Sequence, residues 1–246
     1  MKKSNWSYIS IGFLVLCLLG YVVFAVVKFS KESDTQECSG TIIRIMDENQ
    51  RQFISKGDID KILTKNHISF QGKQAEQIDC KTIEDCIKKN PVVREVHCYK
   101  TPSGTVKIDV WQRTPIMRVM GTTNYYVDDE GEVIPISPNV TAYVPIVTGN
   151  VNKKFAVEEI SKFVVYLQNN KFWNSQIEQI HVDKNNEILL IPRVGDHEII
   201  LGKLDGFELK MEKLRKFYND GLAKIGWGDY KTINLKYKNQ VVCTKK

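Results

Sequence analysis

The sequence contains none of the short motifs that mark common catalytic or phosphate-binding sites. It has no G-x-S-x-G, S-x-x-K or H-E-x-x-H pattern, and Gly202-Lys203 lacks the glycine-rich lead-in of a P-loop. It also has no C-x-x-C pair, and its cysteines and histidines do not have the spacing of a zinc site. The sequence therefore predicts a protein that is not an enzyme, with no metal, cofactor or small-molecule substrate.

Charge of either sign is missing from Ser4 to Val27, a run of 24 residues. Within this run Ile9–Val27 is almost wholly apolar, and about 20 apolar residues are enough for a helix to cross a bilayer. A cleaved signal peptide would have a shorter apolar core and a small-x-small cleavage site, which this segment lacks. We expect residues 8–27 to be an uncleaved transmembrane helix in contact with membrane lipid, after a short tail at residues 1–7.

A strong excess of positive charge is also missing from the remainder of the chain. The 246 residues contain 35 Lys and Arg against 29 Asp and Glu, and the net charge of residues 31–246 is only +3. A nucleic-acid-binding protein concentrates its positive charge in a patch or stripe. The balance therefore excludes nucleic acid as an expected partner, and the lysines on the two sides of the apolar run do not decide its orientation.

Six cysteines are present, and one of them, Cys17, lies within the apolar run. The other five are an odd number, so at least one has no disulfide partner unless two chains are linked. We interpret them as small buried side chains in preference to disulfide partners. The sequence leaves both alternatives open.

Residues 41–113, which follow a linker at residues 28–40, have the apolar pattern of a β-α-α-β-β unit. Ser55 followed by Asp58 is a helix N-cap signal. In the last strand Lys107 and Asp109 alternate with apolar residues, so we expect both to face solvent. The expected elements are a strand at Thr41–Ile45, a helix from Ser55, a helix at Thr82–Lys89, and strands at Val92–Tyr99 and Thr105–Trp111.

We expect a domain boundary at Thr114-Pro115 and a second, β-rich domain at residues 114–246 with two flanking helices. The adjacent carboxylates Asp128, Asp129 and Glu130 are interpreted as a solvated hairpin turn rather than an acid/base pair. The expected strands are at 125–134 (a hairpin), 145–149, 177–182, 187–191, 198–201, 231–237 and 240–243, and the helices at 157–167 and 207–225. The predicted fold class is α+β with a single N-terminal transmembrane helix.

Several stretches together resemble the FtsQ/DivIB family of bacterial cell-division proteins, and the β-α-α-β-β unit resembles a POTRA domain. Two further stretches, Pro192–Gly195 and Gln240–Cys243, are similar to the version found in Bacteroidetes-type bacteria. The stretches that carry the family resemblance are Asn90–Val96, Gln112–Ile116, Tyr126–Gly131, Val144–Gly149 and Ile233–Tyr237.

The resemblance implies a non-catalytic scaffold in the cytoplasmic (inner) membrane, with its N-terminus in the cytoplasm and its C-terminal domain in the periplasm. It implies two bitopic partners, of the FtsB and FtsL type, and a role in coupling their assembly to septal wall synthesis. The partner is expected to add a strand at the C-terminal edge, through Ile233, Leu235, Lys236 and Tyr237. By strand period, Tyr237 could instead complete the core with Ile233 and Leu235.

Two alternatives come from other functional classes. The first is another POTRA-containing module for export or envelope assembly. The second is a membrane-anchored extracytoplasmic enzyme whose site has no recognised motif. Recovery of small bitopic coiled-coil proteins with the anchored full-length chain would favour the scaffold over both.

Overall fold

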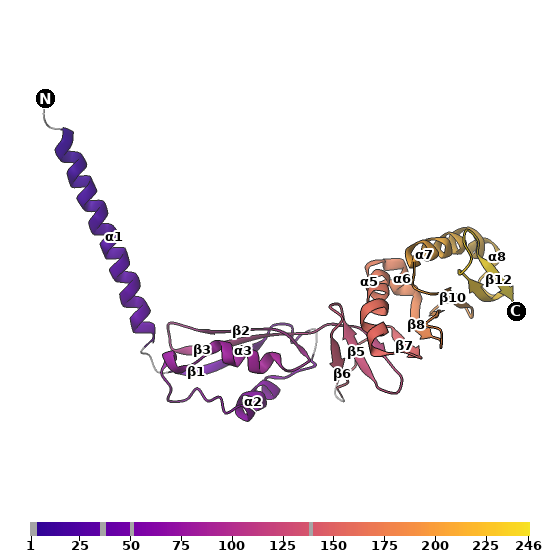
Figure 1. Ribbon diagram of the computed structural model, residues 1–246, viewed down its shortest axis with the longest axis horizontal. Helices are drawn as coiled ribbons and strands as arrows, with labels where there is room; N and C mark the ends of the chain where they lie inside the picture. Colours follow the sequence, from indigo (N-terminus) through magenta and orange to yellow (C-terminus); the bar gives the residue numbers. More distant parts are fainter. Residues whose placement is uncertain (1–3, 35–37, 50–51, 138–139) are drawn as a thin grey trace. The chain divides into compact units, whose positions relative to one another are not determined.

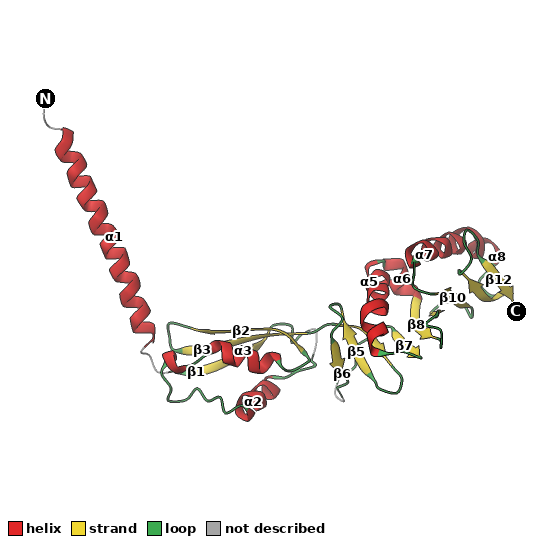
Figure 2. Ribbon diagram, in the orientation of Figure 1, coloured by secondary structure: helices red, strands yellow, loops and turns green. Residues whose placement is uncertain are grey.

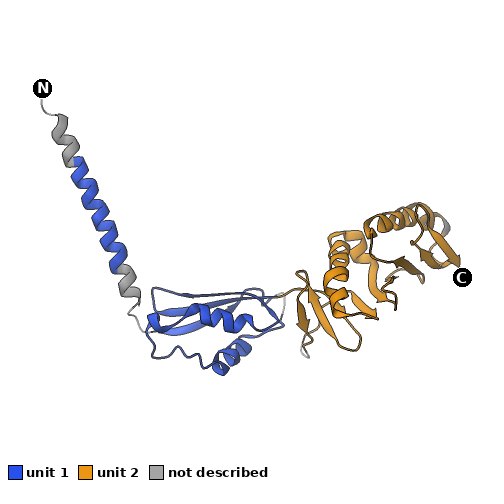
Figure 3. Cartoon of the chain, in the orientation of Figure 1, with its two compact units in different colours: residues 1–112 blue, residues 113–246 orange. Residues whose placement is uncertain are grey.

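The computed structural model describes residues 4–34, 38–49, 52–137 and 140–246. Its chain forms two compact units, residues 1–112 and residues 113–246 (Figure 3). The tail expected at residues 1–7 lies partly outside the described residues, which begin at Ser4, and so does part of the expected linker.

The uncharged run lies in one long helix, α1 (Ser4–Asp34). The segment Ile11–Lys28 is long and apolar enough to cross a membrane, and none of it is buried in the protein. Among the described residues it is the one helix with these properties. The segment carries leucine, valine and phenylalanine on every face, so it has no polar face that could lie against water. A transmembrane helix is expected to have this pattern.

The remainder of the first unit has the predicted order β-α-α-β-β (Figure 2). The strands pair in the order β1-β3-β2, with β1 parallel and β2 antiparallel to the central strand. Helices α2 and α3 pack on β1 and β2 and bury Ile59, Leu63, Ile83 and Ile87. The elements are β1 (Gly40–Ile45), α2 (Lys56–Lys65), η1 (Ala75–Gln77), α3 (Cys80–Lys88), β2 (Val93–Lys100) and β3 (Thr105–Gln112).

The N-cap of α2 is the one predicted. Ser55 Oγ accepts a hydrogen bond from the Asp58 amide at 3.2 Å, and Asp58 Oδ2 accepts one from the Ser55 amide at 3.0 Å. The two side chains satisfy two amides that the helix itself leaves without partners. The Ser55 hydroxyl and the Ser55 amide both donate to the Asp58 carboxylate, and these two bonds hold the pKa of that carboxyl below its usual value.

The expectation that Asp109 faces solvent was wrong, because its side chain is only 9% exposed. Arg44 of the parallel neighbour β1 donates to both carboxylate oxygens, from Nε at 2.7 Å and from Nη2 at 2.6 Å. A two-pronged ion pair of this kind replaces the water that a lone carboxylate needs. The hydrogen bond from Arg44 also lowers the pKa of the Asp109 carboxyl.

The second unit is built on one nine-stranded mixed sheet, in the order β12-β11-β10-β9-β8-β7-β4-β5-β6. The hairpin β5–β6, the central strands β8–β10 and the final pair lie where the sequence predicts strands. The strands are β4 (Pro115–Val119), β5 (Tyr125–Asp128), β6 (Val133–Pro135), β7 (Ile146–Gly149), β8 (Ile177–Val182), β9 (Ile188–Pro192), β10 (Glu198–Gly202), β11 (Tyr230–Asn234) and β12 (Val242–Lys245).

Two helical stretches pack on this sheet and enclose the core of the unit. Phe163, Leu167, Met211 and Leu214 from the helices are fully buried in one cluster with strand residues such as Ile180. Strand β4 and helix α6 were not predicted. The helical segments are α4 (Lys153–Phe155), η2 (Ala156–Ile160), α5 (Ser161–Asn169), α6 (Lys171–Gln176), α7 (Phe207–Lys216), η3 (Phe217–Leu222) and α8 (Ala223–Ile225).

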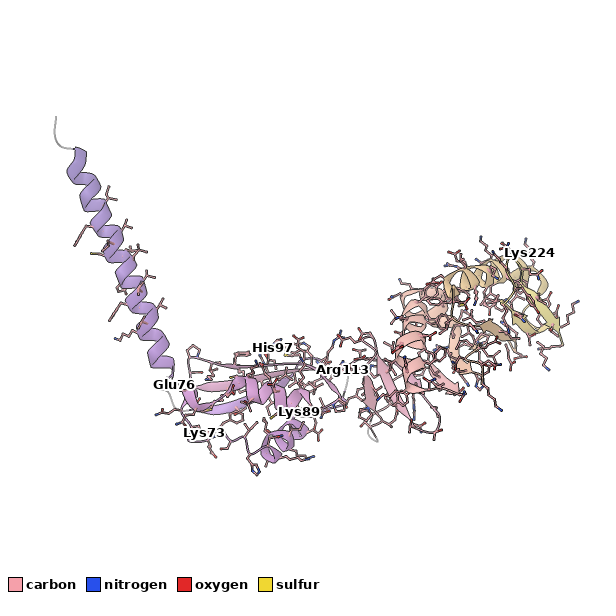
Figure 4. All side chains as sticks on the ribbon, viewed as in Figure 1. Lys73, Glu76, Lys89, His97, Arg113 and Lys224 are labelled. Carbon is pink, nitrogen blue, oxygen red and sulfur yellow. The ribbon has the colours of Figure 1, made fainter. Side chains whose placement is uncertain are left out.

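Asp128 is not solvated, although it lies at the expected hairpin turn. Its side chain is fully buried, and Arg113 Nη1 lies 2.7 Å from its Oδ2 atom. The other oxygen, Oδ1, accepts hydrogen bonds from the Glu130 and Glu132 amides at 3.0 and 2.7 Å. Arg113, labelled in Figure 4, is the first residue of the second unit. One cation and two turn amides therefore take the place of water around this carboxylate.

Candidate protein-interaction site

The residues predicted to bind a partner lie on β11 and on the turn that follows it. Strand β11 is not an edge strand, because it pairs with β10 on one side and with β12 on the other. Ile233 and Leu235 are fully buried in the core. The expectation that these two residues lie on an edge strand was therefore wrong. Strand β12 pairs with the outer side of β11 and is itself the terminal strand.

One edge of the sheet is β12, which Figure 1 shows near α8 at the C-terminal end of the chain, and the other edge is β6. The Leu235 amide donates to the Ile200 carbonyl of β10, so alternation along β11 turns the amides of Thr232 and Asn234 towards β12. These two residues are opposite Thr244 and Val242. The Lys246 amide likewise points inward, to the Asp229 carbonyl.

The alternating pattern on β12 leaves the backbone groups of Cys243 and Lys245 on the outer side. Within the described residues no strand pairs with that side. An edge with free N–H and C=O groups is a template for an added strand. The site can therefore bind an extended peptide by backbone hydrogen bonds.

Lys236 is the second residue after β11 and already has a partner within the chain. Its Nζ atom is 2.7 Å from each carboxylate oxygen of Glu187, the residue before β9. The hydrogen bond to Glu187 raises the pKa of the Lys236 ammonium group. Its stem lies over Gly202, where an added Cβ would be 2.7 Å from Lys236 Cγ. Lys236 thus holds the turn after β11 against two neighbouring strands.

Tyr237 is 49% exposed and does not complete the core with Ile233 and Leu235. Strand geometry ends at Asn234, so the strand period that would turn Tyr237 inward no longer applies. Its carbonyl oxygen accepts a hydrogen bond from Lys213 Nζ of α7 at 2.7 Å, and the Leu235 carbonyl accepts one at 3.2 Å. These two bonds anchor the turn to α7. Burial lowers the pKa of the Lys213 ammonium group.

A groove of about 450 Å³ runs between α7 and the turn after β11. Its exposed apolar surface includes Leu209, 69% exposed, and Tyr237. Five of its lining residues are lysines and two are acids: Lys210, Lys213, Lys216, Lys236 and Lys238, with Asp205 and Glu212. The groove combines apolar contact area with an excess of positive charge.

The positive charge of the whole chain is concentrated in this region. Residues 203–246 contain 11 of the 35 basic residues and 5 of the 29 acidic ones, a net charge of +6. The preceding 202 residues are balanced, with 24 of each sign. Lys224, labelled in Figure 4, is one of these cations. The site is thus suited to a partner that carries negative charge.

Two parts of the site were missed from the sequence. The first is the role of β12 as the edge, since a strand was expected at 240–243 but its place in the sheet order was not. The second is the lysine face of α7. Lysines at 210, 213 and 216 recur every three residues, which places them on one side of a helix. That spacing was a signal available in the sequence.

Comparisons with known proteins agree with this architecture. The family model for FtsQ/DivIB, C-terminal related, matches residues 114–244, and the model for a POTRA-like domain matches residues 36–111. A curated relative, Cell division protein FtsQ of Geotalea daltonii, is 23% identical over 176 residues. That match covers 67% of this chain and 63% of the relative, so the chain spans less than two thirds of the relative's length. Since the first of these matches covers more than half of the sequence, the chain belongs to the FtsQ/DivIB C-terminal related family.

Proposed function

We propose that this protein is a non-catalytic scaffold of the bacterial division machinery with a single membrane span. The family membership and the name of its relative, a cell division protein, support the process. The POTRA-like domain supports a role in binding other proteins. The observation that carries the proposal is the free edge of β12 beside a basic groove.

The proposed orientation places the N-terminus in the cytoplasm and both folded units on the outer side of the cytoplasmic membrane. Helix α1 supports one crossing. A reporter that is active only in the cytoplasm, fused after Lys246, should be silent, while the same reporter fused before Met1 should be active. Activity of the C-terminal fusion at the level of the N-terminal one would contradict the orientation.

The proposed partners are small bitopic division proteins of the FtsB and FtsL type. One of them adds a strand to β12 through the outward backbone groups of Cys243 and Lys245. Backbone pairing supplies affinity without a strict sequence requirement, and neighbouring side chains supply specificity. Such a complex would join membrane proteins outside the cytoplasm and couple their assembly to septal wall synthesis.

Specificity in this proposal comes from the groove and the turn. Tyr237 offers an exposed aromatic ring of the kind that dominates interfaces, and the lysines favour acidic residues next to the added strand. Lys236 contributes to this specificity while its ammonium group remains paired with Glu187. Ile233 and Leu235 act from the core, since they hold β11 in place beneath the edge strand.

A proline at position 245 gives a direct test of strand addition. Lys245→Pro removes an outward N–H and leaves the inward bonds of Val242 and Thr244 in place. Lys245→Gln removes the same charge and keeps the N–H group, so it is the matched control. Full-length protein is purified from membranes in detergent, and co-purified small single-span coiled-coil proteins are quantified by mass spectrometry.

We expect Lys245→Pro to reduce partner recovery at least about tenfold and Lys245→Gln to stay within about threefold of the unmodified protein. Thermal unfolding of both variants checks that the fold is intact. Recovery should also fall as salt rises, since the lysines are exposed. Equal recovery with the proline and glutamine variants would contradict strand addition at β12.

A further inference from the structure

Two cysteines that are 18 positions apart in the sequence meet in the first unit. Cys80 is the first residue of α3, and Cys98 lies on β2. Helix α3 packs on this strand, and the Cys80 side chain lies next to the Cys98 thiol. The remaining cysteine of the helix, Cys86, is two residues past Glu84 and therefore lies on another side of α3.

A second contact fixes the same face of α3 against Cys98. Glu84 is one turn after Cys80, and residues four apart share a helix face. Its Oε1 atom accepts a hydrogen bond from the Cys98 amide at 2.6 Å. The helix therefore cannot turn Cys80 away from β2 without breaking a bond to the backbone of Cys98 itself.

The two thiols differ in their access to solvent. Cys98 is buried, with 9% exposure, and Cys80 is half-buried. Burial raises the pKa of the Cys98 thiol, and the adjacent Cys80 and Glu84 raise it further. Because it is more exposed, Cys80 is the sulfur that another molecule can reach. Cys98 lies next to it and must first lose its proton, which its raised pKa opposes, before its thiolate can attack Cys80.

We propose that Cys80 and Cys98 form a disulfide that joins α3 to β2. The oxidant is a disulfide carrier, either a protein disulfide oxidase or oxidised glutathione. The Cys80 thiolate attacks one carrier sulfur, which forms a mixed disulfide and releases the first carrier thiol. The Cys98 thiolate then attacks Cys80 and releases the second carrier thiol. Two protein thiols are oxidised, and one carrier disulfide is reduced to two thiols.

The inference uses the outward orientation proposed above, because disulfides persist in the periplasm and are rare in the cytoplasm. It does not use the partner site on β12, which lies in the other unit. The closed loop would contain the remainder of α3, the turn at Pro91 and β2 as far as Cys98. Closing such a loop restricts the unfolded chain and so stabilises the first unit.

The pairing itself is tested on purified full-length protein in detergent. The protein is reduced, equilibrated in a buffer of reduced and oxidised glutathione, and alkylated. Digestion should yield a peptide pair joined through Cys80 and Cys98 that separates on reduction. Cys86→Ser is the matched control and should keep this link, whereas Cys80→Ser should lose it. Alkylation of both Cys80 and Cys98, or pairing of either with another cysteine, would overturn the proposal.

The state in the cell is tested on membranes whose thiols are alkylated before any reductant is added. The same linked peptide should be found, and reduction should lower the unfolding temperature of the first unit by at least about 5 °C in the Cys86→Ser protein. Free Cys80 and Cys98 in these membranes would overturn the claim that the bond exists in the cell. Partner recovery measured on the same preparations separates this outcome from a failure of the scaffold function.

Discussion

Arg113 Nη1 lies 2.7 Å from Asp128 Oδ2 in an ion pair whose side chains are 15% and 0% exposed. The pair connects the first residue of the second unit to the turn of the β5–β6 hairpin. Glu130 adds a second carboxylate, at 3.0 Å from the same nitrogen. The position at which the second unit begins is therefore fixed by a buried charge, not only by apolar packing.

Asp128→Ala should lower the free energy of unfolding of the second unit by about 3–5 kcal/mol, because it leaves a buried guanidinium and two turn amides without their acceptor. Chemical denaturation followed by tryptophan fluorescence measures the loss, since Trp173 and Trp227 belong to this unit. Glu132→Gln, an exposed change in the same turn, should cost less than about 0.5 kcal/mol. Similar costs for the two variants would contradict the role of the pair.

Reversing the charge of Lys236 should destabilise the fold as well as affect binding. In Lys236→Glu a carboxylate would face Glu187, which lies 2.7 Å from the lysine nitrogen. We expect the unfolding temperature to fall by a few degrees, roughly 2–4 °C. The exchange Glu187→Lys with Lys236→Glu should restore most of it. If the double variant is no more stable than Lys236→Glu alone, the two residues do not interact in solution.

Lys213→Met should loosen the turn after β11, because the carbonyls of Leu235 and Tyr237 lose a shared donor. The expected loss of stability is about 1 kcal/mol, with faster amide hydrogen exchange in β12. Lys216 lines the same groove and makes no such bond among those described. Lys216→Met should therefore leave amide hydrogen exchange in β12 unchanged. Equal exchange rates in both variants would assign no anchoring role to Lys213.

Stability should fall when the pH drops below about 6.5, the ordinary pKa of histidine. His197 is 2% exposed, and burial lowers its pKa, while the nearby Asp196 raises it and Lys246 lowers it. In this window the unfolded chain binds a proton that the folded chain does not bind, so protonation favours unfolding. The loss begins at the unfolded pKa and continues down to the lowered folded value.

His197→Gln removes this titration while an amide can still meet the Tyr218 hydroxyl, which lies 2.7 Å from His197 Nε2. Between pH 7 and pH 5, the slope of the unfolding free energy against pH should become smaller, by at most about 1.4 kcal/mol per pH unit. A slope that stays the same in the His197 variant would rule out His197 as its source.

Local signals were enough to predict much of the fold. Ser55 and Asp58 are three residues apart and define the start of α2 by themselves. The burial of Asp128 could not be predicted in the same way, because it depends on Arg113, 15 residues earlier in the chain. Turn patterns that contain acidic residues are usually solvated, and only the folded position of Arg113 changes that outcome.

The candidate interaction site shows the same limit. The alternation of Ile233 and Leu235 with polar residues predicted a strand with one buried face, and both side chains are buried. Alternation cannot predict which strand ends the sheet, since that depends on pairing between β10 and β11 across the α7–α8 connection. Alternation also could not predict that Tyr237 lies outside the core, because β11 ends at Asn234, before that residue.

The positive charge beside β12 also has a consequence for self-association. An exposed edge strand can pair with the same strand of a second copy, which is a common route to aggregation. Here such a pair would bring together two segments that each carry a net charge of +6, with Lys245 on the edge itself. Repulsion between like charges opposes that dimer but not a complex with an acidic strand. The lysines therefore disfavour pairing between the β12 edges of two copies of this chain and leave the edge available to an acidic strand.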